Sequence, residues 1–204
     1  MLINVFNANI PGAFVETGVW RGGISIFARG VQRAFNQYNR VVVACDSFAG
    51  LPPGSKKYHE WDPGWDNTPY LSVHNTQVAN NFIEAGLLDP HVVFVKGFFN
   101  DSMEALSKQV KSIAVLRLDG DMYQSTVDVM YRLYDKVPVG GYVIIDDWMI
   151  TEHLPFPAKV AIEDFFKVHG VRETYIPIDQ TAVYWQKTKA VEVQRWRYDK
   201  KDFK

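Results

Sequence analysis

Carboxylate side chains are concentrated in two short segments, Leu118-Asp119-Gly120-Asp121 and Asp146-Asp147. Because the two pairs are 27 residues apart, with room for one helix between them, they can follow neighbouring strands. Carboxylate oxygens and water suit a hard cation, whereas the five histidines and the single Cys45 form no cluster with zinc spacing. The pairs therefore predict a site for Mg²⁺ or another divalent cation, although an isolated Asp-Gly-Asp also fits a metal-dependent glycosyltransferase.

Two further acids lie nearer the N-terminus. Glu16 precedes the glycine-containing turn Thr17–Gly23, and Asp46 ends an apolar run. Glycine lets a backbone turn tightly and approach a ligand, so an acid before such a turn can meet an amine. An acid at the position of Asp46 can accept both hydroxyls of a ribose. Taken singly, each acid also fits an ordinary turn or a helix cap.

These acids must be positioned by short apolar runs that alternate with helical patterns. The predicted strands are 13–16, 41–46, 92–95, 113–119 and 142–146, then 174–178 and 182–186, joined by a tight turn at 179–180. The predicted helices are 24–37, 68 or 72 to 86, 102–110, 125–136 and 158–169. This alternation predicts a mostly parallel sheet that helices cover on both faces, with a closing hairpin that adds an antiparallel strand.

In such sheets, ligands bind where the carboxyl ends of the strands meet. Glu16, Asp46, Asp119 and Asp146 each end a predicted strand, and Asp121 and Asp147 follow closely. Acids gathered at one edge repel one another unless a cation lies among them. A bound metal and a sulfonium cofactor would both supply that positive charge.

The composition is that of an ordinary globular domain. The chain has 204 residues, 47% of them hydrophobic, and a net charge of −1, which predicts one domain over 1–204 and no nucleic-acid or membrane partner. A single cysteine excludes an internal disulfide, and the start of the chain shows no secretory signal, so a cytoplasmic location is expected. We expect the apolar residues of helix 24–37 (Ile24, Phe27, Ala28, Val31 and Phe35) on one side. The basic, aromatic tail 191–204 is expected to fray.

Seven ordered segments between Gly12 and Lys187 carry a resemblance to a known family. They are Gly12–Gly23, Asp46–Pro52, Val95–Phe99, Leu116–Thr126, Gly140–Trp148, Ala161–Phe165 and Val183–Trp185. In them the chain resembles the macrocin O-methyltransferase family, which methylates sugar hydroxyls on macrolides and related natural products. The resemblance implies an α/β, Rossmann-like class I methyltransferase fold. Its mostly parallel seven-stranded sheet has one antiparallel strand near the C-terminus and helices on both faces.

The resemblance also implies roles for individual residues. S-adenosylmethionine would be held at its methionine part by Glu16, Thr17, Gly18, Val19, Gly22, Gly23 and Ser25. Its ribose would meet Asp46, with Ser47 and Phe48 beside it, and its adenine would lie near Gly97 and Phe98. Asp119, which also lies near the cofactor, would bind the metal together with Asp146 and Asp147. Asp121 matches the family's general base.

The expected function is methyl transfer from S-adenosylmethionine to a hydroxyl of a sugar or natural-product acceptor. A metal that binds two adjacent hydroxyls would activate one of them, and Asp121 would take its proton. The partner is a small-molecule hydroxyl acceptor, such as a glycoside, and a homo-oligomer is possible. The aromatic loop 54–70, with Trp61 and Trp65, is a hypothetical lid. Two alternatives stay open: a glycosyltransferase that uses Asp119-Gly120-Asp121, and a non-catalytic cofactor-binding protein of the same fold.

Overall fold

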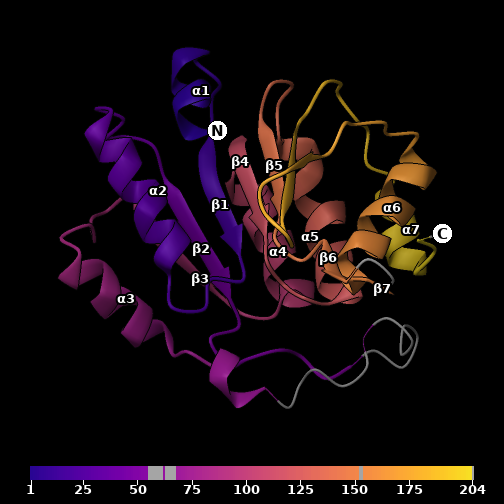
Figure 1. Cartoon of the computed structure of the whole chain (residues 1–204), viewed down its shortest axis with the longest axis horizontal. Helices are drawn as coiled ribbons and strands as arrows, with labels where there is room; N and C mark the ends of the chain where they lie inside the picture. Colours follow the sequence, from indigo (N-terminus) through magenta and orange to yellow (C-terminus); the bar gives the residue numbers. More distant parts are fainter. Residues whose placement is uncertain (55–61, 63–67, 152–153, 204) are drawn as a thin grey trace.

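The computed structural model describes residues 1–54, 62, 68–151 and 154–203 (Figure 1). Seven strands form one sheet in the order β3-β2-β1-β4-β5-β9-β8. They are β1 Ala13–Thr17, β2 Val42–Asp46, β3 Val92–Lys96, β4 Ile113–Leu118, β5 Tyr142–Ile145, β8 Ile176–Pro177 and β9 Val183–Gln186. Strands β1 to β5 pair in parallel, and β9 is antiparallel to both β5 and β8. The predicted fold class is confirmed.

Helices lie on both faces of this sheet (Figure 1). On one face are α1 Leu2–Asn7, α2 Gly23–Ala34 and α3 Asn75–Glu84. On the other are α4 Phe99–Gln109, α5 Tyr123–Leu133, α6 Pro157–His169 and α7 Arg195–Lys200. Two 3₁₀ turns, Pro69–Leu71 and Tyr134–Lys136, and a small hairpin of β6 Met149–Thr151 with β7 Leu154–Pro155 complete the described elements. In the described parts of the chain, no helix has the length and apolar character to cross a membrane.

The central strands are buried on both faces because helices pack on each side. Every residue of β1 and β4 is buried. On the side of α4 to α6 the core includes Met103, Val127 and Phe165, whereas on the other side Phe6 and Phe82 belong to two smaller clusters. This double coverage explains why the strands have continuous apolar sequences instead of an alternating pattern.

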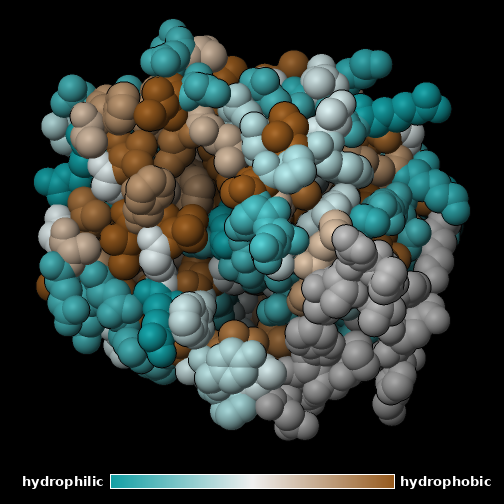
Figure 2. All heavy atoms as spheres, in the orientation of Figure 1, coloured by the Kyte–Doolittle hydropathy of each residue, from teal (hydrophilic) through white to brown (hydrophobic). Residues whose placement is uncertain are grey.

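Helix α2 buries only part of the apolar side that its sequence pattern predicts. Ile24 and Phe35 are each 44% exposed and Phe27 is 65% exposed. Of that side the helix buries Ala28, together with the polar residues Ser25, Arg29 and Gln32. Arg29 can be buried because its guanidinium pairs with Asp89 at 2.7 Å and donates to main-chain carbonyls. Figure 2 shows the resulting apolar surface over α1 and α2.

The expectation of a frayed C-terminal tail is also wrong. Helix α7 packs against α5, and the tail residues Val193 and Phe203 are only 7% and 3% exposed. The Tyr198 hydroxyl donates a hydrogen bond of 2.6 Å to the Asp128 carboxylate on α5. Aromatic contacts to Tyr131 and this buried hydrogen bond order a segment whose composition alone suggests a solvated end.

Candidate active site

The carboxyl ends of β1, β2 and β4 are joined by main-chain hydrogen bonds beyond the strands. Asp119 donates its N–H to the Thr17 carbonyl at 2.8 Å, and Gly18 donates to the Cys45 carbonyl at 2.8 Å. Gly18 has a φ of +88°, and a Cβ there would lie 1.7 Å from the Asp119 carbonyl oxygen. Glycine is therefore required for the turn after β1 to approach the loop after β4.

Three carboxylates gather at this edge. Asp119, Asp146 and Asp147 each offer an oxygen, and these oxygens lie within 4.8 Å of one another. Burial is the largest cause that raises the pKa of Asp119 and Asp147, and neighbouring carboxylates add to it. A cation among them would relieve this repulsion. The three side chains are those that the sequence analysis assigns to the metal.

Arg117, which the sequence analysis does not single out, lies among these acids. Its guanidinium is within 2.9 Å of Glu16, 2.6 Å of Asp119 and 2.5 Å of Asp146. The side chain is buried, and its three acidic partners raise its pKa against the effect of burial. Arg117 therefore supplies part of the positive charge that an edge of clustered acids requires.

Each of the three candidate metal ligands is held through one oxygen. Arg117 binds Oδ2 of Asp119 and Oδ1 of Asp146, and the main-chain N–H of Asp121 donates to Oδ2 of Asp147 at 2.9 Å. One carboxylate oxygen can be fixed in this way while the other faces a cation. Such outer contacts orient metal ligands in proteins.

Glu16 has a different environment from the one that the glycine turn suggests. It is 1% exposed, accepts a hydrogen bond from the Ser25 hydroxyl and pairs with Arg117. Burial raises its pKa to about 7, with the Arg117 charge acting in the opposite direction. The described structure thus pairs Glu16 with a guanidinium of the protein, and its contact with the cofactor's amine stays a prediction.

Asp121 combines an uncommon backbone conformation with a place in the wall of the main cavity. Its φ is +58°, a left-handed conformation that is uncommon for a residue other than glycine. Its side chain lines the main cavity. Burial, followed by the charges of Asp119 and Asp146, raises its pKa, which moves it toward the range useful to a general base at neutral pH.

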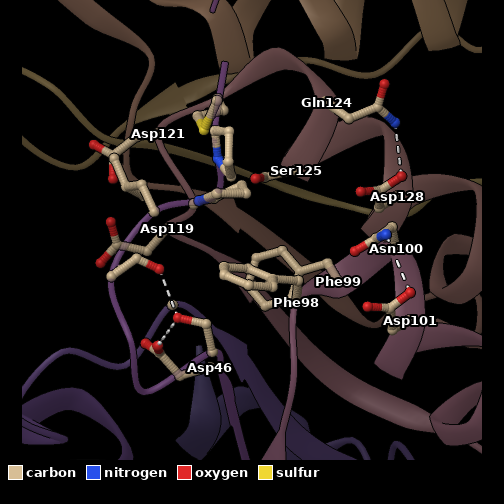
Figure 3. Close-up of a pocket in the computed structure, with 18 of the residues that line it drawn as sticks. Asp46, Phe98, Phe99, Asn100, Asp101, Asp119, Asp121, Gln124, Ser125 and Asp128 are labelled. Atoms are coloured by element: carbon tan, nitrogen blue, oxygen red, sulfur yellow. Dashed lines mark hydrogen bonds between the residues drawn. The ribbon is translucent and has the colours of Figure 1, made fainter. Parts of the chain in front are cut away.

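A cavity of about 610 Å³ opens beside this acidic edge (Figure 3). Gly18, Asp46, Ser47, Phe98, Asp119 and Asp121 are the predicted site residues that line it. Among the described residues, the predicted site residues absent from the lining are Glu16, Thr17, Val19, Gly22, Gly23, Ser25, Phe48, Gly97 and the two predicted metal ligands Asp146 and Asp147. Most of them lie in the segment 16–25, at the end of β1 and the start of α2, whereas Asp146 and Asp147 directly follow β5.

Asp46 holds two neighbouring loops together through its carboxylate. Its Oδ2 accepts the main-chain N–H of Val19 at 2.8 Å, and its Oδ1 accepts that of Phe48 at 2.7 Å. The side chains of Val19 and Phe48 are buried in the core beside α3. Asp46 thus ties the glycine turn after β1 to the loop after β2 while it also lines the cavity.

Asp62 is a second residue that the sequence analysis missed. It is fully buried and accepts main-chain N–H groups from Tyr123 at 2.5 Å and Gln124 at 3.0 Å, at the start of α5. An acid in this position satisfies unpaired helix donors and favours the helix N-terminus electrostatically. Residues 55–61 and 63–67 of the hypothetical lid, with Trp61 and Trp65 among them, lie outside the described residues.

The chain is similar to several known proteins along most of its length. A family model described as Macrocin-O-methyltransferase (TylF) matches residues 1–187. Demethyldecarbamoylnovobiocin O-methyltransferase of Streptomyces niveus is 39% identical over 91% of this chain and 70% of that protein. Mycinamicin III 3''-O-methyltransferase of Micromonospora griseorubida is 37% identical over 88% of this chain and 70% of that protein. The solved structure of the O-methyltransferase NovP is 39% identical, with a TM-score of 0.86 over 92% of this chain and 76% of that one.

Proposed function

The chain belongs to the macrocin O-methyltransferase family, and we propose that it methylates a hydroxyl of a sugar or glycoside-like natural product with help from a divalent cation. It is an enzyme, an S-adenosylmethionine-dependent O-methyltransferase, as its relatives of 37 to 39% identity are O-methyltransferases. Because the chain belongs to a family of O-methyltransferases, we no longer consider a glycosyltransferase or a non-catalytic cofactor-binding protein. The acceptor class and the metal are the parts that we propose.

The observation that carries the metal proposal is the arrangement of Asp119, Asp146 and Asp147. Their oxygens lie within 4.8 Å of one another, which suits a hard cation that prefers carboxylate ligands. Arg117 and the Asp121 N–H each engage oxygens of this group, so the ligands are already oriented. The donor set fits Mg²⁺ or a similar ion. When bound, such an ion would lower the pKa of the acceptor hydroxyls that contact it.

The protein's own residues supply the remaining steps. We propose that Asp121 accepts the proton of the reacting hydroxyl as the oxygen attacks the methyl carbon and the sulfur leaves with the bonding electrons. Asp46 would accept the ribose hydroxyls, with Ser47 and Phe48 beside it and with Gly97 and Phe98 near the adenine. The turn from Glu16 to Ser25, including Thr17, Gly18, Val19, Gly22 and Gly23, would hold the methionine part. Holding both reactants in line is itself a major source of rate acceleration.

Calorimetric titration tests the proposal directly. S-adenosylmethionine and S-adenosylhomocysteine would be titrated into the wild type and into Asp146→Asn, each with Mg²⁺ and with EDTA, and MgCl₂ would be titrated into both proteins separately. We expect both proteins to bind S-adenosylhomocysteine, whereas only the wild type should show a heat of Mg²⁺ binding. Glu163→Gln, a change on the exposed surface of α6, is the matched control and should bind both ligands. No Mg²⁺ heat in the wild type would refute the metal site, and no binding of either nucleoside would refute the cofactor site.

From the sequence we also propose that residues 1–204 form a single domain, that the protein is a homo-oligomer in solution and that its location is cytoplasmic. Light scattering would measure the oligomeric state, and urea unfolding would test the single domain.

A further inference from the structure

The C-terminal segment, residues 188–203, lies beyond the part of the chain that the family model matches, which ends at residue 187. It is nonetheless firmly docked. Arg195 pairs with Asp135 at 2.6 Å, and the main-chain N–H of Gln194 donates to Nε2 of His169 at 2.9 Å. Together with the burial of Phe203, these contacts make the segment a fixed part of the fold.

Three side chains of this segment, Tyr198, Lys201 and Phe203, line the large cavity. The Tyr198 hydroxyl donates to Oδ1 of Asp128, and the same oxygen accepts from Nε2 of Gln124 at 2.7 Å. Asp128 and Gln124 also line the cavity. The segment therefore closes one side of the cavity and fixes the orientation of a carboxylate within it.

The cavity has two chemically different ends (Figure 3). Asp46, Asp119 and Asp121 lie at one end, and the side chains of Phe98 and Phe99 lie in the middle. The opposite end has amides and carboxylates from the first two turns of α4 and α5: Asn100, Asp101, Gln124 and Asp128. The C-terminal segment borders this second end, on α5.

The proposed reaction indicates which part of the cofactor lies at each end of the cavity. The methyl group must lie near Asp121, where the proton is taken, and the ribose lies at Asp46. The base of the nucleoside is then the part that extends past the phenylalanine rings toward Asp128. A flat base suits such a place, because aromatic faces can contact its rings and carboxylates can accept hydrogen bonds from its amino group.

We propose that the C-terminal segment closes the nucleobase end of the cofactor cavity. Tyr198, Lys201 and Phe203 form its wall, and Tyr198 acts as a positioning residue through its hydrogen bond to Asp128. This inference rests on the proposed cofactor site. It makes a segment outside the family match a determinant of cofactor affinity.

The test is calorimetry with two ligands, S-adenosylhomocysteine and 5'-deoxy-5'-methylthioadenosine, which shares the adenosine but lacks the amino acid. The variants are Tyr198→Phe, Lys201→Ala and a chain that ends at Lys189. The truncation should raise the Kd of both ligands by at least about tenfold, and each point variant by about threefold, because a wall that preorganises the site is lost. Trp196→Ala is the matched control: Trp196 is 48% exposed on the same helix, and its change should alter either Kd by less than about twofold.

Thermal unfolding of each variant shows whether it is folded, and if the truncation unfolds, the point variants decide. Unchanged Kd values in the folded variants would overturn the inference, whatever happens to the KM of the acceptor. A weaker affinity for S-adenosylhomocysteine with an unchanged affinity for methylthioadenosine would also overturn it, because the segment would then act on the amino-acid part. If the wild type bound neither ligand, the proposed cofactor site itself would fail.

Discussion

Arg117 places a buried positive charge between Glu16, Asp119 and Asp146. Replacing it by methionine keeps the volume but leaves a buried carboxylate without its partner. We expect Arg117→Met to lower the free energy of unfolding by about 3–5 kcal/mol at neutral pH, as is usual when one partner of a buried ion pair is removed. Urea denaturation measures this loss. Adding Glu16→Gln to Arg117→Met should restore part of the lost free energy of unfolding, because a neutral amide then replaces one of the buried carboxylates that lost its partner.

The exposed pair of Lys108 with Glu104 on α4 is the control for that experiment. Lys108 is 72% exposed, so Lys108→Met should leave the urea midpoint almost unchanged. A loss below about 1 kcal/mol in Arg117→Met would show that the guanidinium contributes little to the assembly of the acidic edge.

Asp121 can be tested separately from the cofactor site, since its proposed role concerns the proton alone. Asp121→Asn should lower kcat by about 10²–10⁴-fold, the usual contribution of a general base. The affinity for S-adenosylhomocysteine should not change. In the wild type, kcat should rise with pH as Asp121 loses its proton, and this rise should be absent in the variant. A kcat close to that of the wild type, with any acceptor that supports turnover, would remove Asp121 from this role.

Sequence patterns located the acids but not their partners. Asp119 and Asp146 follow apolar runs directly, and the carboxyl ends of parallel strands meet at one edge, so their proximity could be predicted. Arg117 lies within such a run, between Leu116 and Leu118, where a single charged residue has no distinguishing pattern. Its partner Glu16 is 101 residues away in the chain, a pairing that only the folded sheet reveals.

The positions where helices begin also depend partly on residues that are distant in the sequence. Helix α5 begins at Tyr123 instead of Ser125 because Asp62, from another part of the chain, caps it. Helix α3 begins after His74, whose side chain accepts the Thr76 N–H, and the earlier residues Pro69–Leu71 form a 3₁₀ turn. Helices α1 and α7 have six residues each, too few for a clear periodic signal.

The contact between α5 and α7 should make stability depend on pH through Asp128. Burial raises the pKa of Asp128 to about 6, although hydrogen bonds from Tyr198 and Gln124 act to lower it. Since the unfolded value is near 3.8, the folded protein binds a proton between these two pH values that the unfolded chain releases. The stabilisation that Asp128 contributes is therefore complete below about pH 4 and is lost as the pH rises through about 6.

Asp128→Asn should remove this dependence. From about pH 4 to about pH 7, the variant should gain up to about 3 kcal/mol in unfolding free energy relative to the wild type, as measured by urea denaturation. Tyr198→Phe removes a bond that stabilises the charged form, so its decline should continue to a higher pH than that of the wild type. Parallel curves for the wild type and Asp128→Asn would contradict the assignment.

Residues that are far apart in the sequence form the walls of the cavity, so a ligand bound there contacts several parts of the chain at once. Gly18 and Asp46 lie at the ends of β1 and β2. Phe98 and Gln124 lie at the starts of α4 and α5, and Tyr198 belongs to the C-terminal segment. If residues 1–204 form one domain, a ligand in this cavity must stabilise all of these parts together. S-adenosylhomocysteine at 100 times its Kd should add about 2.7 kcal/mol to the free energy of unfolding.

Urea unfolding followed both by tryptophan fluorescence and by far-ultraviolet circular dichroism tests this expectation. The two probes should give one coincident transition, and the ligand should move both by the same amount, because a single cooperative unit cannot lose one layer alone. Asp46→Ala should keep a single transition, at a lower urea midpoint because two main-chain N–H groups lose their partner, and should lose most of the shift because a proposed ribose contact is gone. Two separate transitions, or a shift in one probe only, would divide the chain into independent units and place the cavity within one of them.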